Sequence, residues 1–448
     1  MKATIYTTNS YGEWRAAPLT QGTSLAGITT VEEAEEIFGS FMGCGVAITG
    51  SSCYNLAQME PQERQRLLRF LYTEEGLNLR VGRLTIGSSD YSAEVYSYDD
   101  GEEDLALERF SVARDREYII PMIQEILEVC PDLVLFASPW SPPGWMKTGG
   151  SMGGGYMRSA YVDCYADYII KYLRAYESEG ISVYAVTPQN EPETQQKGKM
   201  PACIWHPEIE AEFIKCLKKK LREQGMATKV WCYDHGFDGA AMRVDWLLEN
   251  DAELAQCCDG AAFHYYGGCI EHTAFLKDKY PGLELHFTEG GPRLYDHYDT
   301  DWCKWGLMVI RALKNGYRSF TGWNLMLDEC GGPNVGPFFC GGLVTRNRSD
   351  CSLNFSGQFK AFRHFAAIDS ACRIVPLRFR RIQEENLSRY PLDIHYTEGC
   401  AVHTANGKTV LFLVNPNKEK EQLRFFGGGQ CHYIEMLPDT LATVVIEG

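Results

Sequence analysis

The sequence predicts an α/β fold, namely a (β/α)8 TIM barrel joined to a small all-β sandwich domain built from both termini. Between about residues 43 and 370, short apolar runs alternate with longer amphipathic runs, which is typical of parallel strand–helix units. Eight strand candidates can be counted there, and eight such units close a barrel. Toward both ends of the chain the residues instead alternate with a period of two, and no long helical pattern intervenes, which indicates antiparallel strands.

The eight strand candidates follow one another at the spacing of strand–helix units: Gly43–Thr49, Leu79–Ile86, Leu133–Ser138, Val183–Thr187, Val230–Tyr233, Ala261–Tyr265, Leu285–Thr288 and Ser319–Asn324. The helical runs between them include Arg114–Cys130, Tyr161–Glu179, Ile209–Gln224 and Trp302–Lys314. In the second of these, a 3.6-residue period places five side chains on one face: Ala166, Ile169, Ile170, Leu173 and Tyr176. An open doubly wound sheet is the structural alternative, but no GxGxxG motif follows the first strand.

Three segments follow from these patterns. Residues 1–28 are expected to supply N-terminal strands of the sandwich, residues 29–372 the barrel, and residues 373–448 the remaining sandwich strands. The last segment contains the turn signals Asn406-Gly407 and Asn415-Pro416-Asn417. Because no low-complexity linker separates the segments, we expect the two modules to pack rigidly together.

Composition excludes several classes of protein. A hydrophobic content of 45% and a charged content of 23% are ordinary for a globular chain, and the net charge of −16 argues against nucleic acid as a partner. No apolar run reaches eighteen residues, so no membrane span is expected. The N-terminus lacks the apolar core of a secretory signal, which favours a cytoplasmic protein. A homo-oligomer is compatible with the sequence.

The 17 cysteines contain no CxxC pair, and many lie in apolar segments. Such spacing supports neither a zinc cluster nor a disulfide framework. We therefore expect free thiols, as in a reducing compartment, and no metal or organic cofactor.

Active sites of TIM barrels lie at the carboxyl ends of the strands, so the residues that follow each apolar run are the candidates. Sugar recognition uses acids and amides for hydroxyl groups and aromatic rings for the C–H faces of a pyranose. The strand ends offer this mixture: Asp90 and Ser92, Trp140 and Ser141, Asn190 and Glu191, Asp234 and His235, His264 and Tyr266, Glu289, and Trp323 and Asn324.

Glu191 and Glu289 are the candidate catalytic pair. Glu191 precedes Pro192, which stops a helix and favours an extended backbone at the glutamate. Glu289 precedes Gly290 and Gly291, which let the chain turn away sharply. The two glutamates are 98 residues apart, which matches three strand–helix units. A lone glutamate after a strand is more often a cap or surface residue, but two of them after the fourth and seventh strands favour catalysis.

Other candidates have plain structural readings. Asp90 could be a turn residue before Tyr91. His264 could be a buried histidine that orients its neighbours, so we assign it a supporting role. Trp140 and Trp145 could both belong to a packed proline-rich loop, and we interpret only Trp140 as a platform for a sugar.

At these residues the sequence resembles glycoside hydrolase family 30, the group that includes glucosylceramidases. The resemblance covers essentially the whole chain and rests on an ordered set of motifs: Arg83-Leu-Thr-Ile-Gly-Ser-Ser-Asp90-Tyr-Ser, Ala137-Ser-Pro-Trp140-Ser-Pro-Pro, Gln189-Asn190-Glu191-Pro192, Phe263-His264-Tyr265-Tyr266, Phe287-Thr-Glu289, and Gly322-Trp323-Asn324 with Gly331-Gly-Pro-Asn334.

The resemblance implies a role for most of the candidates. Glu191 corresponds to the acid/base and Glu289 to the nucleophile. Asn190 matches an amide at the 2-hydroxyl of the sugar, and Arg83 matches a buried arginine that supports the nucleophile. The remaining matches line the −1 subsite, which holds the sugar that is cleaved off: Asp90 and Trp140 at the far hydroxyls, Tyr266 near the nucleophile, and Trp323 as an aromatic wall.

Two positions depart from the family pattern. The first strand carries Cys44, Val46 and Gly50, where Gly-Phe-Gly-Gly followed by threonine and an acidic residue is usual. The sixth strand carries Tyr265 where tryptophan is common. The first departure concerns one wall of the site, and the second concerns contacts with the leaving group.

The resemblance predicts a retaining β-glycoside hydrolase that works by double displacement through a glycosyl-enzyme intermediate. Glu289 would attack the anomeric carbon, and Glu191, whose pKa we expect the neighbouring negative charge to raise, would protonate the departing oxygen. A β-glucoside or another β-linked glycoside or oligosaccharide is the expected substrate. The alternatives within the family are a β-xyloside, a β-fucoside and a β-1,6-glucan.

Two interpretations from other classes compete with a glycosidase. A non-catalytic carbohydrate-binding barrel would be expected to have lost one carboxylate, and both are present. A metal-dependent barrel enzyme would need carboxylates at successive strand ends, and strands six and eight end without any.

Overall fold

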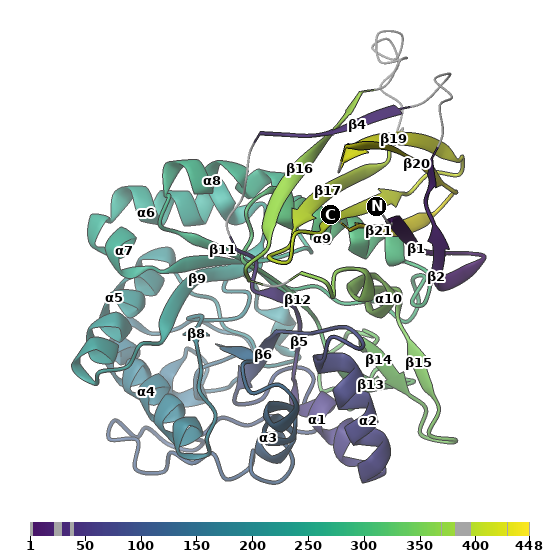
Figure 1. The fold of residues 1–448 in the computed structure, drawn as a ribbon. Helices are drawn as coiled ribbons and strands as arrows, with labels where there is room; N and C mark the ends of the chain where they lie inside the picture. Colours follow the sequence, from purple (N-terminus) through teal and green to yellow (C-terminus); the bar gives the residue numbers. More distant parts are fainter. Residues whose placement is uncertain are drawn as a thin grey trace.

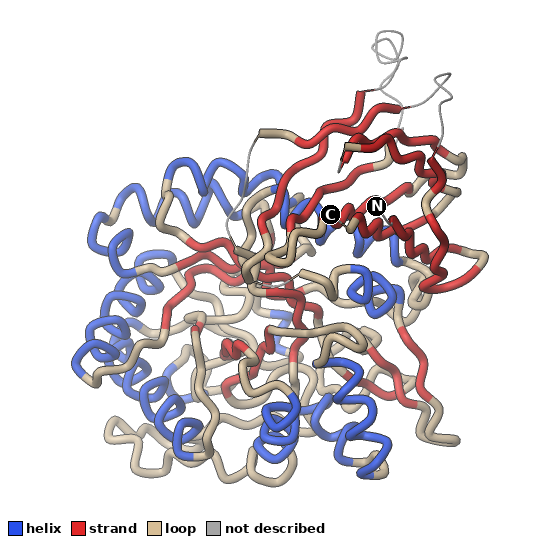
Figure 2. The backbone as a smooth tube through the Cα atoms, viewed as in Figure 1, coloured by secondary structure: helices blue, strands red, loops and turns tan. Residues whose placement is uncertain are grey.

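The computed structural model describes residues 3–21, 29–35, 40–368, 370–380, 396–427 and 429–447. Within these ranges the chain forms a closed eight-stranded barrel, a ten-stranded sheet and a small three-stranded sheet. Helices surround the barrel, and the ten-stranded sheet lies beside it together with both termini (Figure 1). Figure 2 shows the same division, with helices confined to the barrel and its border with the large sheet. The predicted fold class is confirmed.

The barrel strands are β5 to β12, in the order of the sequence, and all pairs are parallel. The ring closes where β12 pairs with β5. Nearly every side chain in these strands is buried, as expected for a parallel sheet covered on both faces. Their bounds are β5 (Gly43–Ala47), β6 (Val81–Ile86), β7 (Val134–Pro139), β8 (Ala185–Val186), β9 (Lys229–Gly236), β10 (Gly260–His264), β11 (Glu284–Glu289) and β12 (Ser319–Gly322).

The four predicted helical runs each contain a helix: α3 (Ile119–Val129), α4 (Val162–Ser178), α5 (Pro207–Glu223) and α9 (Trp302–Lys314). All five side chains predicted for one face of α4 are buried. Each large aliphatic side chain buried in this way stabilises the barrel by about 1.5–3 kcal/mol. The other helices are α1 (Gly50–Ala57), α2 (Pro61–Tyr72), α6 (Trp246–Asn250), α7 (Ala252–Cys257), α8 (Ala274–Lys279) and α10 (Gly357–His364).

The ten strands of the large sheet come from both ends of the chain, as predicted. They form one continuous sheet in the order β2-β1-β21-β18-β17-β16-β4-β19-β20-β3, whose two halves share one hydrophobic cluster, as the layers of a sandwich do. Their bounds are β1 (Ala3–Asn9), β2 (Gly12–Pro18), β3 (Thr20–Gln21), β4 (Thr29–Glu33), β16 (Arg373–Arg380), β17 (Glu398–His403), β18 (Thr409–Asn415), β19 (Glu421–Gly427), β20 (Gln430–Met436) and β21 (Thr440–Ile446).

Strand β16 joins the two halves of this sheet. Its first half, Arg373–Pro376, pairs with β17, and its second half, Leu377–Arg380, pairs with β4. Strand β4 therefore belongs to the sandwich, although the predicted boundary at residue 28 placed it with the barrel. Five residues with one strongly apolar side chain, Val31, carry too short a pattern to show which core they join. Residues 1–2, 22–28, 381–395, Gly428 and Gly448 of the predicted sandwich segments lie outside the described residues.

Helices α9 and α10 connect the two modules. His364 of α10 bonds through its two ring nitrogens to Thr443 (2.9 Å) and Thr8 (2.8 Å), one residue from each end of the chain. From α9, the indole of Trp302 donates to the carbonyl of Asp439 at 3.0 Å. These helices are thus covered on one side by the barrel and on the other by the sandwich.

A third sheet lies in the connection between β12 and α10 and consists of β13 (Met326–Asp328), β14 (Val344–Arg346) and β15 (Leu353–Phe355). Strands of three residues are too short to produce a recognisable alternation, and the sequence did not predict them. All 17 cysteines are free thiols. No helix in the described part of the chain is long and apolar enough to cross a membrane.

Candidate active site

The structure gathers the predicted site residues at one end of the barrel. All of them except Arg83 end a strand or follow one at its carboxyl end, which is where parallel barrels place their active sites. Arg83 is inside β6, Asp90 follows β6, Trp140 follows β7, Asn190 and Glu191 follow β8, His264 ends β10, Tyr266 lies two residues beyond it, Glu289 ends β11, and Trp323 follows β12.

Arg83 is the cationic centre of the site and is fully buried. Its guanidinium donates to the carboxylate of Glu289, to Asn190 Oδ1 at 2.8 Å and to Asp234 Oδ2 at 2.8 Å. The ring of Trp140 lies 4.8 Å from the guanidinium carbon. Burial of a cation without partners would destabilise the fold by several kcal/mol. The anions and acceptors around Arg83 offset this cost. The network brings together three residues that are distant in the sequence, Arg83, Asn190 and Glu289.

Asp234, in β9, is the buried anion of the network. Burial alone would raise its pKa, but Arg83 and His264 together with hydroxyl donors hold the pKa of this carboxyl well below its usual range. It therefore stays ionised and fixes the two cations beside it. Its five side-chain donors are Arg83 (2.8 Å), Ser138 (2.7 Å), Thr187 (2.8 Å), His264 (2.9 Å) and Thr288 (2.7 Å).

His264 lies between three carboxylates. Its Nε2 is 2.9 Å from Asp234 Oδ1, and its Nδ1 is 3.3 Å from Glu191 Oε1 and 3.9 Å from Glu289 Oε2. Burial alone would lower the pKa of the imidazole, but Glu289, Asp234 and Glu191 raise it to about 9. At neutral pH the ring is thus an imidazolium that donates from both nitrogens.

Glu191 adopts a backbone conformation that the sequence did not predict. Its φ is +50°, in the left-handed region, rather than the extended region that Pro192 favours. This turn lets the Glu191 N–H donate to the carbonyl of Asp234 at 3.0 Å. The side chain then reaches back over the barrel mouth, where Gln196 Nε2 donates to Oε2 at 3.0 Å.

The expected direction of the Glu191 pKa, a rise caused by neighbouring negative charge, is wrong. Burial raises the pKa of this carboxyl, but the hydrogen bond and charge of His264, together with the charges of His235 and Arg83, outweigh burial and hold it below its ordinary value. The imidazole of His264 lies 3.3 Å from Glu191, and this contact forms only in the folded barrel.

Glu289 ends β11 at the same mouth. The two glycines after it have no positive φ, so backbone conformation does not require them. Close packing does: a Cβ on Gly290 would lie 2.8 Å from Phe287, and one on Gly291 would lie 2.9 Å from Trp323. Because Glu289 and Glu191 share His264 Nδ1 as a neighbour, their separation is limited.

Beside these acids lies a cluster of aromatic and polar side chains suited to a sugar. Trp140 and Trp323 stack with ring centroids 5.1 Å apart. Asp90 Oδ1 and Asn324 Nδ2 are buried and have no hydrogen-bond partner among the described residues. Burial, followed by the charges of Glu289 and Glu191, raises the pKa of Asp90 well above its ordinary value. An orphaned acceptor and an orphaned donor beside two indoles are groups that ligand hydroxyls can satisfy.

Tyr266 lies differently from what the sequence suggested, whereas Tyr265 and Trp145 are held by packing and hydrogen bonds. Tyr266 is 40% exposed at the rim, and in the described part of the chain it makes no hydrogen bond to Glu289. Tyr265 packs edge-on against Trp305 of α9 at 5.4 Å, and its hydroxyl donates to the carbonyl of Gly291 at 3.4 Å. Trp145 is held in its loop by a bond from its indole to Asp99, the structural role expected for it.

The altered first strand is accommodated locally. Cys44 and Val46 are buried in the main core. Thr49 caps α1 and also donates to Asn324 Oδ1 at 2.8 Å, which ties this strand to the end of β12. A Cβ at Gly50 would make ordinary contacts with Ser92 at 3.4 Å and with Ile119 at 3.6 Å.

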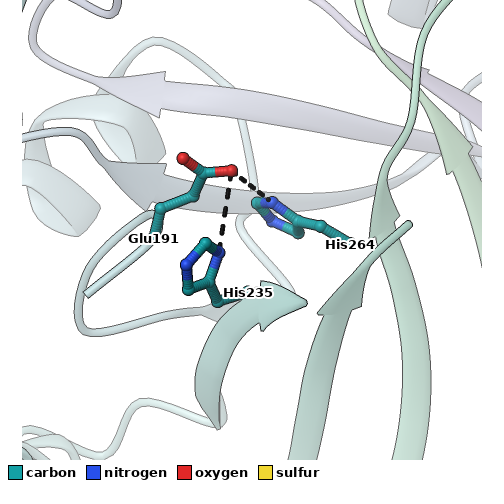
Figure 3. A group of neighbouring side chains, drawn as sticks. All are labelled: Glu191, His235 and His264. Atoms are coloured by element: carbon teal, nitrogen blue, oxygen red, sulfur yellow. Dashed lines mark hydrogen bonds and ion pairs between the residues drawn. The ribbon is translucent and has the colours of Figure 1, made fainter. Parts of the chain in front are cut away.

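Sequence patterns did not single out Asp234, His235 or Gln196. The first two were on the candidate list as polar residues at a strand end, but a buried ion-pair centre looks like any turn aspartate in the sequence. Gln196 lies in the loop after β8, at a distance from Glu191 that only the folded loop defines. Glu191, His235 and His264 are also a set that could hold a metal ion, since their ligand atoms lie within 4.8 Å of one another (Figure 3).

Comparisons with known proteins agree with this geometry. Residues 41–367 match the model of the glycosyl hydrolase family 30 TIM-barrel domain. An endo-1,6-β-D-glucanase of Neurospora crassa is 29% identical over 72% of this chain and 69% of its own length. The lysosomal acid glucosylceramidase of Mus musculus is 28% identical over 69% of this chain and 64% of its own. Among solved structures, SrfJ from Salmonella typhimurium superposes with a TM-score of 0.89 at 26% identity, over 100% of both chains.

Proposed function

Because the chain belongs to glycosyl hydrolase family 30 and is a glycosidase, we propose that it hydrolyses β-glucosides with retention of the anomeric configuration. The observation that carries this proposal is the pair of glutamates at the mouth of the barrel. Both lie within 4 Å of one imidazole nitrogen, yet only Glu289 is bound by the Arg83 guanidinium. One carboxylate is thus paired with a guanidinium while the other sits beside an imidazole that can donate a proton.

In the first step Glu289 attacks the anomeric carbon and the glycosidic bond breaks. The guanidinium of Arg83 binds this carboxylate and orients it. The departing oxygen takes a proton from Glu191, which completes the glycosyl-enzyme. In the second step Glu191 removes a proton from water, and the water oxygen displaces Glu289 from the same face of the sugar that the leaving group left.

His264 accounts for how Glu191 can be an acid despite its lowered pKa. In the resting site one proton lies between His264 Nδ1 and Glu191 Oε1, which are 3.3 Å apart. Substrate binding removes water and brings no charge, so the neutral arrangement, with the proton on Glu191, becomes more favourable in the desolvated site. The imidazole thereby stores the proton that the leaving group receives.

The sugar follows from the aromatic and polar cluster and from the relatives. Asp90 Oδ1 and Asn324 Nδ2 offer one acceptor and one donor for hydroxyls beside the indoles of Trp140 and Trp323. The two named relatives act, by their names, on glucosylceramide and on a 1,6-β-D-glucan, both β-glucosides. A β-glucoside is therefore the first choice, and a β-1,6-glucan is the second candidate among substrates.

The test is a panel of aryl β-glycosides with glucose, xylose and fucose, together with a β-1,6-glucan. We expect the glucoside to give the highest kcat/KM, and proton NMR to show the β-anomer as the first product. An α-anomer released first would overturn retention. A higher kcat/KM for the xyloside or the fucoside would overturn the assignment of glucose as the sugar but would not affect the proposed mechanism.

Substitution of the two acids distinguishes their roles. Glu289→Gln should abolish turnover without unfolding the chain, and azide should rescue Glu289→Gly with a glycosyl azide of inverted configuration. Glu284→Gln is the matched control, since Glu284 begins the same strand at the opposite end of the barrel and pairs with Lys229 at 2.7 Å. Loss of activity in Glu284→Gln equal to that in Glu289→Gln would remove the assignment.

A further inference from the structure

Two histidines point at one oxygen of Glu191. His264 Nδ1 lies 3.3 Å and His235 Nδ1 lies 3.7 Å from Glu191 Oε1, and Figure 3 shows the two imidazoles converging on that atom from adjacent strands. The first distance is a hydrogen bond. The second is too long for one, and His235 Nδ1 is buried without a partner among the described residues. His235 therefore has a free ring nitrogen directed at the acid/base.

These distances fit the edges of a metal coordination sphere. Zinc bonds to nitrogen and oxygen are about 2.0–2.2 Å, so neighbouring ligand atoms of a tetrahedral site are roughly 3.3–3.5 Å apart. The three ligand atoms here all lie within 4.8 Å of one another, with two of the separations close to that value. The third separation is the one between the two imidazole nitrogens, and a small movement of His235 is enough to shorten it. The side chain of His235 is 22% exposed.

The surroundings of His264 match those of a metal-binding histidine. Its other nitrogen, Nε2, is 2.9 Å from the fully buried carboxylate of Asp234. Such a carboxylate behind the imidazole fixes the ring, and Nδ1 becomes the atom that faces the ion once the ion has displaced the Nδ1 proton to solvent. Neither Arg83 nor Thr288, which hold Asp234 in turn, needs to move.

We propose that Glu191, His235 and His264 form a binding site for a transition-metal dication such as Zn²⁺, and that the bound ion reversibly inhibits the enzyme. Two imidazoles and one carboxylate suit Zn²⁺, Co²⁺, Ni²⁺ or Cu²⁺, whereas Mg²⁺ and Ca²⁺ prefer oxygen ligands. The binding half of the proposal rests on geometry alone. The inhibition half rests on the proposed function, since it requires Glu191 to be the acid/base.

Inhibition follows because Glu191 cannot serve both the ion and the leaving group. With Oε1 coordinated, the carboxylate accepts no proton from His264 and delivers none to the glycosidic oxygen. Glu289 Oε2 lies 3.9 Å from His264 Nδ1, so the ion also lies close to the second catalytic carboxylate and blocks the approach of a sugar. The site is accessible from the mouth, where Glu191 is 13% exposed.

Binding is measured first, by calorimetric titration of the full chain with Zn²⁺ in a non-chelating buffer. Exposed Cys269, Cys330 and Cys351 could also take up zinc, so these thiols are alkylated beforehand. We expect one Zn²⁺ per chain, and at least a ~10-fold weaker affinity in His235→Ala and in Glu191→Gln. The matched control is His206→Ala, because His206 is 63% exposed and outside the site; it should bind like the wild type.

Two further measurements test metal binding and inhibition separately. The visible spectrum of bound Co²⁺ should show ligand-field bands without an intense thiolate charge-transfer band, and His235→Ala should lose these bands. Zn²⁺ should inhibit aryl β-glucoside hydrolysis, with reversal by EDTA, and the inhibition constant should rise at least tenfold in His235→Ala relative to that variant's own activity.

Unchanged zinc affinity and unchanged Co²⁺ bands in both His235→Ala and Glu191→Gln would overturn the site. Zinc bound at this site without inhibition of an active glycosidase would overturn the inhibitory role. If the chain proves inactive on every glycoside, calorimetry still decides the binding site, and the two failures stay distinct.

Discussion

At the scale of single residues, the site is built around opposite charges that have been removed from water. Arg83 and Asp234 are both fully buried and are joined at 2.8 Å, and each has a second charged partner, Glu289 and His264. Removal of one member of such a group leaves the others uncompensated in a low dielectric, which costs far more than the pair contributes at a surface.

Substitution of Asp234 tests this network. Asp234→Asn leaves Arg83 and His264 without their shared anion, so we expect the free energy of unfolding to fall by about 3–5 kcal/mol and kcat to fall by at least ~100-fold. Urea denaturation and steady-state kinetics measure the two effects. Asp163→Asn is the control, because its 2.9 Å pair with Lys220 has a 77% exposed carboxylate and should be worth at most about 1 kcal/mol. A variant Asp234→Asn with wild-type stability and rate would refute the network.

Asp90 supplies a prediction about binding. Its buried Oδ1 has no partner among the described residues, so a sugar hydroxyl can satisfy it. Asp90→Ala should lower kcat/KM by roughly 10- to 100-fold, the value of a hydrogen bond to a buried carboxyl group. Asp99→Ala is matched, since Asp99 is also buried with one orphaned oxygen but pairs with Arg109 at 3.2 Å in a loop. Equal losses of kcat/KM in the two variants would mean that Asp90 acts only through the fold.

At the scale of elements, Asp301 shows how one helix start responds to pH. The residue precedes α9, its Oδ2 accepts from the Trp305 indole at 2.8 Å, and its Oδ1 is buried without a partner in the described chain. Burial raises the pKa of this carboxyl to about 7 although Lys304 lowers it. The folded pKa is therefore above the unfolded one. The protonated form favours folding at low pH, and that contribution is lost as the pH rises through 7.

Asp301→Asn removes this titration and keeps an acceptor for Trp305. We expect the variant to gain stability relative to the wild type as the pH rises from 5 to 8, by roughly 2–4 kcal/mol. Urea unfolding at both pH values measures the difference. The exposed Asp299→Asn should show no such trend. A constant difference between Asp301→Asn and the wild type across this range would contradict the raised pKa.

The barrel elements were predictable because their patterns are local. Helix α4 buries the five side chains that its 3.6-residue period selects, and each of the eight predicted strands overlaps a barrel strand. Strand β8 shrinks to Ala185–Val186, although the apolar run is longer. The three-residue strands β13 to β15 were missed since they lack the length for a period.

The site was predictable in its membership and less so in its electrostatics. Strand ends pointed to Glu191, Glu289 and most of the other candidates, and the family motifs added Arg83. The left-handed backbone of Glu191 and the direction of its pKa depend on Asp234 and His264, which meet it only in the folded barrel. The membership of β4 in the sandwich has the same origin, because pairing with β16 and β19 decides it.

At the scale of the whole molecule, α9 and α10 belong to both modules. Buried His364 bonds to both ends of the chain, Trp302 bonds to the loop before β21, and Arg311 of α9 pairs with Glu398 of β17. Neither module can lose the other without exposing these helices to water.

Barrel and sandwich should consequently unfold together. Differential scanning calorimetry should show one transition whose calorimetric and van't Hoff enthalpies agree. His364→Leu, which breaks both bonds to the sandwich, should lower the midpoint of that transition and keep it single. Two separate transitions in the wild-type protein would show that the modules are independent.

The central claim is that Glu289 forms the glycosyl-enzyme, and covalent trapping tests it most directly. A 2-deoxy-2-fluoro-β-glucoside with an activated leaving group slows the release of the sugar, so the intermediate accumulates and peptide mass spectrometry locates the bond. The account predicts one fluoroglucosyl group per chain, on the peptide that contains Glu289. A label on Glu191, or steady hydrolysis of the parent glucoside with no label on any carboxylate, would contradict it.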